Sequence, residues 1–207
     1  MRFKCVHCGH CCINKSVQAS ITLDDIKRIS EFTGKDHNFL INNNFLGLVA
    51  SGTSEPNVFD IDIGLKYPCK FRKDNKCSIY EARPLNCRIF PLFLIAEVPF
   101  RRLKEYLDED FKCRDHIEDD KENLRQIREY KKNIGTQILK ESEKTDKFMA
   151  INNLAKKIDI SQHQNFPYLK VSSLNPKSQA CKRIIFCESL IDKSHTERLK
   201  RILDMNS

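Results

Sequence analysis

The sequence predicts a mostly α-helical fold with small β and irregular regions that are nucleated by metal. Ten of the 207 residues are cysteines, and seven of these gather in two regions of the first half. Three segments carry helix signals, namely two capping patterns and one long charged stretch with an apolar stripe. Only one short stretch, residues 58–63, shows the clear apolar–polar alternation of a half-buried strand.

The first helix is expected to begin after Thr22, because the run Thr22-Leu23-Asp24-Asp25 resembles a capping box. Apolar residues then recur at helical spacing, and Gly34 stands where a helix would end. Residues 35–57 are polar and contain several asparagines and glycines, so a loop or short irregular pieces are expected there. Leucine- and isoleucine-rich residues 92–96 are expected to form the partner of the 58–63 strand.

Residues 115–145 are expected to form a charged helix with a single apolar stripe. The pattern Ser194-x-x-Glu197 predicts a capping box before a last helix. A boundary near residue 114 then divides the chain into a cysteine-rich metal-chelating domain, residues 1–114, and a helical C-terminal region, residues 115–207. The apolar stripe of the helix expected at residues 115–145 consists of Ile117, Leu124, Ile127, Ile134 and Ile138.

Composition limits the functional classes. The net charge of +8 is spread over both halves of the chain, so the sequence does not favour a nucleic-acid partner. The N-terminus lacks the apolar run of a signal peptide, and no stretch approaches the 18 apolar residues of a membrane span. We therefore expect a cytoplasmic protein with no membrane partner. Clustered cysteines in a reducing compartment are better interpreted as metal ligands than as disulfides.

The first cysteine group is Cys5-x-x-Cys8-x-x-Cys11-Cys12. A two-residue gap lets flanking thiolates turn back onto one metal, because a tight loop closes at little entropic cost. The first three cysteines also match the opening of the bacterial ferredoxin run. The match ends there, because Cys12 replaces the spacer and no Cys-Pro follows.

The second group has wider gaps, and with Cys113 it brings the total to eight candidate ligands. Eight thiolates are enough for two four-sulfur centres, whether of zinc or of a cubane iron–sulfur cluster. Without Cys113, the second centre would keep an open position. If their backbone is extended, the adjacent Cys11 and Cys12 point in opposite directions and serve two centres, although one of them could be a plain buried thiol. The candidate metal ligands are Cys5, Cys8, Cys11, Cys12, Cys69, Cys77, Cys87 and Cys113.

Other residues near these groups have two interpretations each. His7 and His10 are offset from the cysteines and are interpreted as bystanders, with metal ligation as the alternative. His116 could pair with Cys113 as Cys-x-x-His. Arg88 could donate hydrogen bonds to sulfur or to an anion, or form a surface ion pair. Cys181 and Cys187 lie in an apolar setting and are interpreted as structural thiols.

The ordered motifs resemble those of the CxxCxxCC, or YkgJ-type, family of cysteine cluster proteins. The resemblance covers about residues 5–113 and implies a zinc- or iron-chelating domain. The flagellin N-methylases are similar at a greater distance, which would imply iron–sulfur-dependent methyl transfer. No glycine loop for S-adenosylmethionine (SAM) supports that cofactor. The motifs are Cys5-x-x-Cys8-Gly9-x-Cys11-Cys12, Thr22-x-x-Asp25-Ile26, Cys69-Lys70-Phe71 and Cys77-Ser78-Ile79-Tyr80-Glu81-x-Arg83-Pro84-x-x-Cys87-Arg88-x-Phe90-Pro91.

Three hypotheses follow. The leading one is a metal-binding protein that holds an iron–sulfur cluster, of the [4Fe–4S] type, or zinc through its clustered cysteines. Its reaction and its protein or small-molecule partner are unknown, and metal ligation is expected to substitute for a missing core in residues 1–113. The second is an iron–sulfur-dependent methyltransferase or redox enzyme. The third is a zinc-stabilised module that binds RNA or protein. The sequence does not decide whether the chain is an enzyme.

Overall fold

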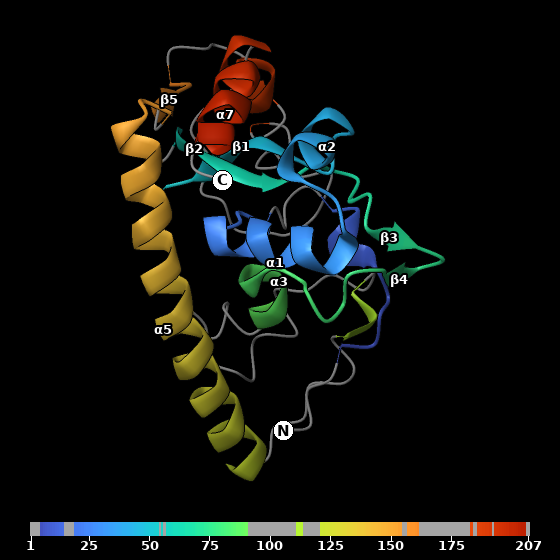
Figure 1. Ribbon diagram of the computed structural model, residues 1–207. Coiled ribbons are helices and arrows are strands. Elements are labelled where there is room, and N and C mark those ends of the chain that lie inside the picture. The colour runs from blue at the N-terminus through green and yellow to red at the C-terminus, as the bar shows by residue number, and fades with distance from the viewer. Residues whose placement is uncertain are drawn as a thin grey trace.

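The computed structural model describes residues 5–14, 19–53, 55, 57–90, 111–113, 121–154, 157–161, 183, 186–191 and 193–205. These residues form a mostly α-helical fold with two small sheets, which confirms the predicted fold class (Figure 1). None of the described helices is both long and apolar enough to cross a membrane. The predicted strand at residues 92–96 lies outside the described part of the chain.

Helix α1, Leu23–Thr33, begins and ends where the sequence predicts. Thr22 accepts a hydrogen bond from the backbone N–H of Asp25, and the Asp25 carboxylate accepts one from the N–H of Thr22, so the capping box is complete. Gly34 closes the helix in the left-handed conformation at φ 65°. Its apolar face, with Ile26 and Ile29 buried, packs into the main core.

The loop predicted for residues 35–57 is wrong in most of its length. It contains the short helix α2, His37–Asn42, capped by Asp36, and strand β1, Leu46–Gly52. Strand β1 pairs in antiparallel register with β2, Val58–Leu65, which confirms the predicted strand. The glycines of Leu46–Gly52 conceal the strand signal, because they interrupt its run of apolar residues.

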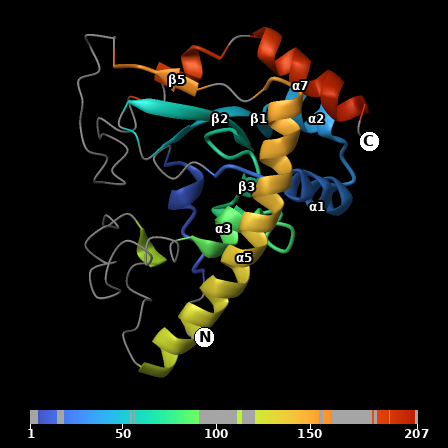
Figure 2. The ribbon, with the colours of Figure 1, turned by 90° about the vertical axis from the view of Figure 1, so that its left-hand side faces the viewer.

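The main sheet has the order β1–β2–β5, and strand β5, Lys157–Asp159, comes from the C-terminal part of the chain. Figures 1 and 2 show helix α7, Lys193–Met205, on one side of this sheet and α1 on the other. Leu199, Ile202 and Leu203 of α7 belong to the same buried cluster as the apolar residues of α1, β1 and β2. Residues from both sides of position 114 therefore share one core, and the proposed division into two domains remains a prediction.

Both helices predicted in the C-terminal part are present, with different bounds from those predicted. Helix α7 begins at Lys193, so Ser194 lies in its first turn and not at the N-cap position that the capping-box pattern predicts. The long charged helix is present as α5, Lys121–Ile151. Within its predicted stripe Ile127 is buried, and Ile134 and Ile138 are partly buried, in a second apolar cluster. The other stripe residues, Ile117 and Leu124, have no described side chain.

Helix α5 is fastened to the start of α1 by a buried polar cluster. Glu141 accepts hydrogen bonds from the Thr22 hydroxyl at 2.8 Å and from both terminal nitrogens of Arg28 at 3.0 and 2.9 Å. The Thr145 hydroxyl accepts from the N–H of Leu23 at 3.1 Å. Burial raises the pKa of Glu141, but the hydrogen bonds from Arg28, Gln137 and Thr22 outweigh it and hold this pKa below its usual value.

We expect Glu141→Gln to lower the free energy of unfolding by about 1–3 kcal/mol, because it removes one of the two carboxylates that pair with the partly buried Arg28. A lowered folded-state pKa contributes stability that is present above the usual carboxyl pKa and is lost as pH falls through the folded value. The difference between wild type and Glu141→Gln should therefore shrink below about pH 4. Urea unfolding at several pH values measures it. The exposed Glu143→Gln is the control, and an equal loss of stability in that variant would contradict the assignment.

Candidate metal centre

The N-terminal cysteines lie on a tight turn. The short 3-10 helix η1, His10–Cys12, follows Gly9, which adopts the left-handed conformation at φ 70°. A Cβ atom at Gly9 would lie 2.5 Å from Nε of Arg72, so glycine is required both by backbone conformation and by space. This close approach places the Arg72 guanidinium against the cysteine turn.

The second group of cysteines is joined to this turn through the backbone. The N–H of Cys69 donates to the carbonyl of Cys12 at 2.8 Å. A small hairpin follows, with strands β3, Arg72–Lys73, and β4, Lys76–Cys77. Its tip is held by a hydrogen bond from Arg72 to the Asn75 side chain. Cys69 and Cys77 therefore stand at the two sides of one hairpin, next to Cys12.

The last cysteine of this group lies on helix α3, Leu85–Ile89, whose N-cap is Pro84. The N–H of Leu85 donates to the buried carboxylate of Asp25 at 3.1 Å, and the Asn86 side chain donates to the carbonyl of Ser20 at 2.7 Å. The capping residue of α1 thus also fixes the start of the helix that carries Cys87.

Arg88 has a different role from those that the sequence suggests. Its Nε donates to the carbonyl of Arg83 at 2.9 Å, and a terminal nitrogen donates to the carbonyl of Glu81 at 2.8 Å. These bonds brace the turn before α3, so the described partners of the Arg88 guanidinium are backbone carbonyl groups.

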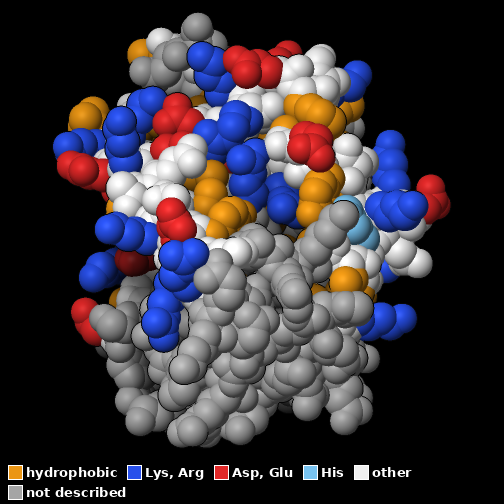
Figure 3. Space-filling view, turned by 90° about the horizontal axis from the view of Figure 1, so that it is seen from below, with side chains coloured by type: hydrophobic (Ala, Val, Ile, Leu, Met, Phe, Trp, Pro, Cys, Tyr) orange, Lys and Arg blue, Asp and Glu red, His pale blue; other side chains and the backbone are white. Residues whose placement is uncertain are grey.

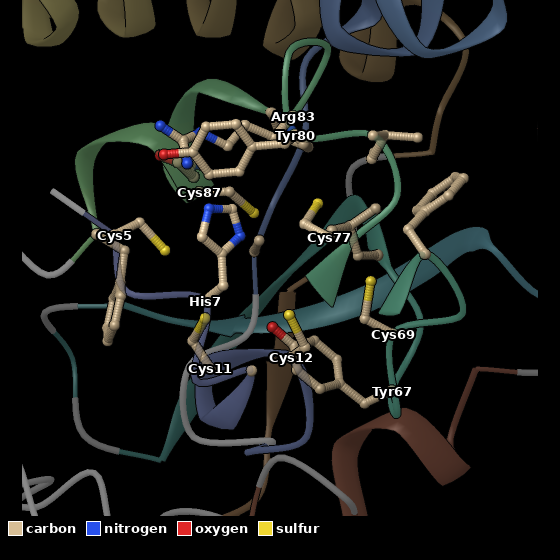
Figure 4. Close-up of a pocket in the computed structure, with 18 of the residues that line it drawn as sticks. Cys5, His7, Cys11, Cys12, Tyr67, Cys69, Cys77, Tyr80, Arg83 and Cys87 are labelled. Atoms are coloured by element: carbon tan, nitrogen blue, oxygen red, sulfur yellow. The ribbon is translucent and has the colours of Figure 1, made fainter. Parts of the chain in front are cut away.

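These three pieces enclose one cavity of about 280 Å³. Figure 4 shows its sulfur atoms distributed around the space, with the His7 ring between them. Among the described residues, no three histidine, cysteine or acidic side chains converge on a point that could hold a single metal ion. The thiols surround a volume larger than one ion. Six of the eight candidate cysteines line it: Cys5, Cys11, Cys12, Cys69, Cys77 and Cys87.

The expectation that Cys11 and Cys12 point in opposite directions is wrong. It assumed an extended backbone, whereas both residues belong to the helical turn η1. Their thiols contact each other, and both line the same cavity. The adjacency of the two cysteines therefore gives no reason to assign them to separate centres.

Electrostatics singles out Cys12 as the most acidic thiol of the cavity. Hydrogen bonds from the thiols of Cys11 and Cys69, together with the nearby Arg72 charge, lower the pKa of Cys12 to about 3. The same bonds, with burial, raise the pKa of Cys11 and of Cys69. Burial also raises the pKa of Cys87. Most of these thiols hold their protons in the absence of metal, so metal binding must release protons.

Cys8 and Cys113 form a pair of thiols that has Cys5 as a neighbour. Neither lines the cavity, and their thiols contact each other. Cys113 is buried in the second apolar cluster beside Phe111 and Ile127. Burial first, and then the neighbouring Cys8 and Cys5, raise the pKa of Cys113 to about 12. His116, its suggested partner, lies outside the described residues.

Aromatic and basic side chains form part of the cavity wall, and the sequence did not predict this role for them. Tyr80 lies in the wall with the Arg83 guanidinium 3.8 Å from its ring centroid and the His7 ring 4.4 Å from it. Tyr67 is also in the wall, and burial followed by the charges of Cys87 and Cys11 raises its pKa. The run from Cys77 to Cys87 contains Tyr80 and Arg83 and was the signal available in the sequence.

Of the remaining candidates, Cys187 does not line the cavity. Cys187 is fully buried in the main core, and burial raises its pKa to about 12, which agrees with a structural thiol. Cys181 lies outside the described residues. On the face shown in Figure 3, lysine and arginine side chains are interspersed with acidic and apolar ones wherever the surface is described.

We expect Asp25→Ala to cost about 3–5 kcal/mol of unfolding free energy, because it removes a buried carboxylate that pairs with the partly buried Arg28 and leaves two backbone N–H groups without their acceptor. Since Leu85 is one of the donors, metal retention by the cavity should fall as well. Thermal unfolding and metal content measure the two effects. Asp24→Ala removes only a surface ion pair to Lys144 and should leave both unchanged, so equal effects in both variants would contradict this role.

The sequence of this chain matches a known protein family. Residues 4–182 match the CxxCxxCC family, described as "Putative zinc- or iron-chelating domain". The match spans most of the chain, and the protein therefore belongs to this family. The matched region includes every cysteine of the cavity. Neither the curated proteins nor the solved structures contain a significant match to the chain.

Proposed function

We propose that this protein binds an iron–sulfur cluster in the six-thiol cavity. The observation that carries the proposal is the arrangement of six thiols around one cavity, in which no three donors of the described residues converge on a single point. A tetrahedral structural zinc site needs four cysteine or histidine ligands around one ion, with sulfur at about 2.3 Å. A cluster is instead held by thiolates on different iron atoms, which suits sulfurs that are spread around a larger space.

The size and lining of the cavity support the same choice. Its volume of about 280 Å³ is at the lower limit of pockets for organic ligands, about 300–1,000 Å³. The rest of its lining is mostly apolar and aromatic, with Asn75, Arg83 and Asn86 among the polar residues, and such surroundings influence the redox potential of a bound metal. The Arg72 and Arg83 side chains offset the negative charge that several thiolates would bring.

We assign the cluster to Cys12, Cys69, Cys77 and Cys87. Cys12 contacts the thiol of Cys69, and its charge acts on Cys77 and Cys87. These residues come from the cysteine turn, the hairpin and α3, so the cluster would join all three pieces of the wall. Four thiolates complete a cubane cluster, and Cys5 and Cys11 remain in the cavity as additional donors. Free thiols throughout the described chain suit a reducing cytoplasm.

Anaerobic purification followed by iron, zinc and acid-labile sulfide analysis tests the proposal. We expect iron and sulfide in equal amounts, at least four of each per chain, and a brown protein with broad visible absorption. Zinc without sulfide, or a colourless protein that takes up no cluster on reconstitution with iron and sulfide, would contradict it.

A further inference from the structure

The backbone at His7 has a conformation that needs a reason. Its φ is 55°, in the left-handed region that residues with a Cβ rarely adopt. Such outliers persist only where the surroundings hold them, and they cluster at functional sites. His7 lies between Cys5 and Cys8, so this conformation determines where the imidazole points relative to the cysteine turn.

The imidazole is held at the cavity by a three-layer stack. Arg83 packs over one neighbour, Tyr80, and the ring of Tyr80 lies 4.4 Å from that of His7 at an interplanar angle of 39°. All three residues line the cavity. Figure 4 shows the His7 ring among the sulfur atoms of Cys5, Cys11 and Cys87. The ring is therefore positioned before any metal arrives.

The Nδ1 atom of His7 is buried and has no hydrogen-bond partner among the described residues. Buried polar atoms are nearly always satisfied, and an exception calls for an explanation such as a bound ion. Neutral imidazole nitrogen is a common metal ligand, and it binds through a lone pair while the other ring nitrogen keeps the proton.

His10 provides the contrast within the same turn. Its ring packs edge-on against Phe111 at 4.3 Å, and its Nε2 pairs with the Asn14 side chain at 3.3 Å. It does not line the cavity. These two histidines cannot be distinguished from the sequence, whereas the structure directs only His7 toward the sulfur atoms.

We propose that His7 ligates metal in the cavity through Nδ1, beside Cys5 and Cys11, so that the centre has one nitrogen ligand in addition to its cysteine sulfurs. The inference rests on the proposed function. Protein donors to a cluster bind different metal atoms, so a nitrogen ligand from His7 does not require three donors to converge on one point.

Nitrogen coordination is tested on the anaerobically purified holoprotein by X-ray absorption at the edge of the metal that it contains, and by pulsed EPR of the reduced protein. We expect a light first-shell scatterer at about 2.0–2.1 Å beside sulfur at about 2.3 Å. We also expect a nitrogen hyperfine coupling that changes when histidine is labelled with ¹⁵N. Both signals should disappear in His7→Phe, which keeps the stack on Tyr80, and persist in His10→Phe.

A second variant, His7→Asn, controls for misfolding of His7→Phe, because asparagine tolerates the positive φ of this position. It should retain the cluster and lose the imidazole coupling. An unchanged nitrogen signal in both His7 variants, or a first shell of sulfur alone in the wild type, would overturn the inference. Metal and sulfide analysis of the same samples separates the two proposals: zinc with a His7 nitrogen would refute the cluster but keep the ligand, and a chain without metal would refute both.

Discussion

Removing the metal is expected to open the cavity walls and leave the main core folded. The cysteine turn, the hairpin and α3 meet mainly around the thiols, and the energy of thiolate–metal bonds is folding energy for the segments that they join. The helices and sheet behind them share an apolar cluster in which Ile29, Ala50 and Leu199 are fully buried. This differs from the expectation that all of residues 1–113 depend on metal, because β1, β2 and α1 lie in that range and are well packed.

Hydrogen exchange before and after anaerobic chelation measures the effect. Amide protection in residues 67–90 should fall by at least about 100-fold, which corresponds to about 2.7 kcal/mol, while protection in α1, β1 and β2 stays within a few-fold of its value in the holoprotein. Uniform loss of protection would mean that the metal supports the whole fold. No loss anywhere would mean that the cavity is rigid without it.

Replacement of Cys12 by serine should have the largest effect of any single cysteine substitution. Its thiol contacts those of both Cys11 and Cys69, and its backbone carbonyl accepts the N–H of Cys69. Substitution of residues around a metal ligand costs about 10–100-fold in metal affinity. Loss of a ligand itself should exceed that range, so we expect Cys12→Ser to weaken metal binding by more than about 100-fold.

Competition with a chelator measures the affinity, and three matched variants locate the effect. Cys8→Ser and Cys113→Ser change thiols that contact each other outside the cavity, so metal content should persist even where stability falls. Cys187→Ser removes a buried thiol of the main core and controls for the loss of packing. Equal loss of metal in Cys113→Ser and Cys12→Ser would contradict the six-thiol assignment.

The sequence could predict those features that are set by local chemistry. The capping box at Thr22 and the glycine stop at Gly34 act within one turn of chain, so α1 was predictable to the residue. The alternation in residues 58–63 was visible because β2 has one face against the core. Strand β1 and helix α2 were not predicted, since glycines interrupt the apolar run of β1, α2 has only six residues, and both are stabilised by packing against distant elements.

The candidate site was predictable in its residues and not in its arrangement. Cysteine spacing identified eight thiols, but it does not contain the tertiary contacts that separate Cys8 and Cys113 from the rest. Two neighbouring histidines look alike in a sequence, and only the fold turns His7 toward the cavity and His10 toward Phe111. The same applies to Arg88, whose carbonyl partners are set by the turn that it braces.

Anomalous scattering at the iron edge, from crystals of the anaerobically purified protein, tests the central claim most directly. Iron peaks should lie inside the cavity, bounded by the sulfurs of Cys12, Cys69, Cys77 and Cys87, with further density toward Cys5 and Cys11. A cavity that contains a single zinc ion, or iron bound elsewhere on the chain, would contradict the account.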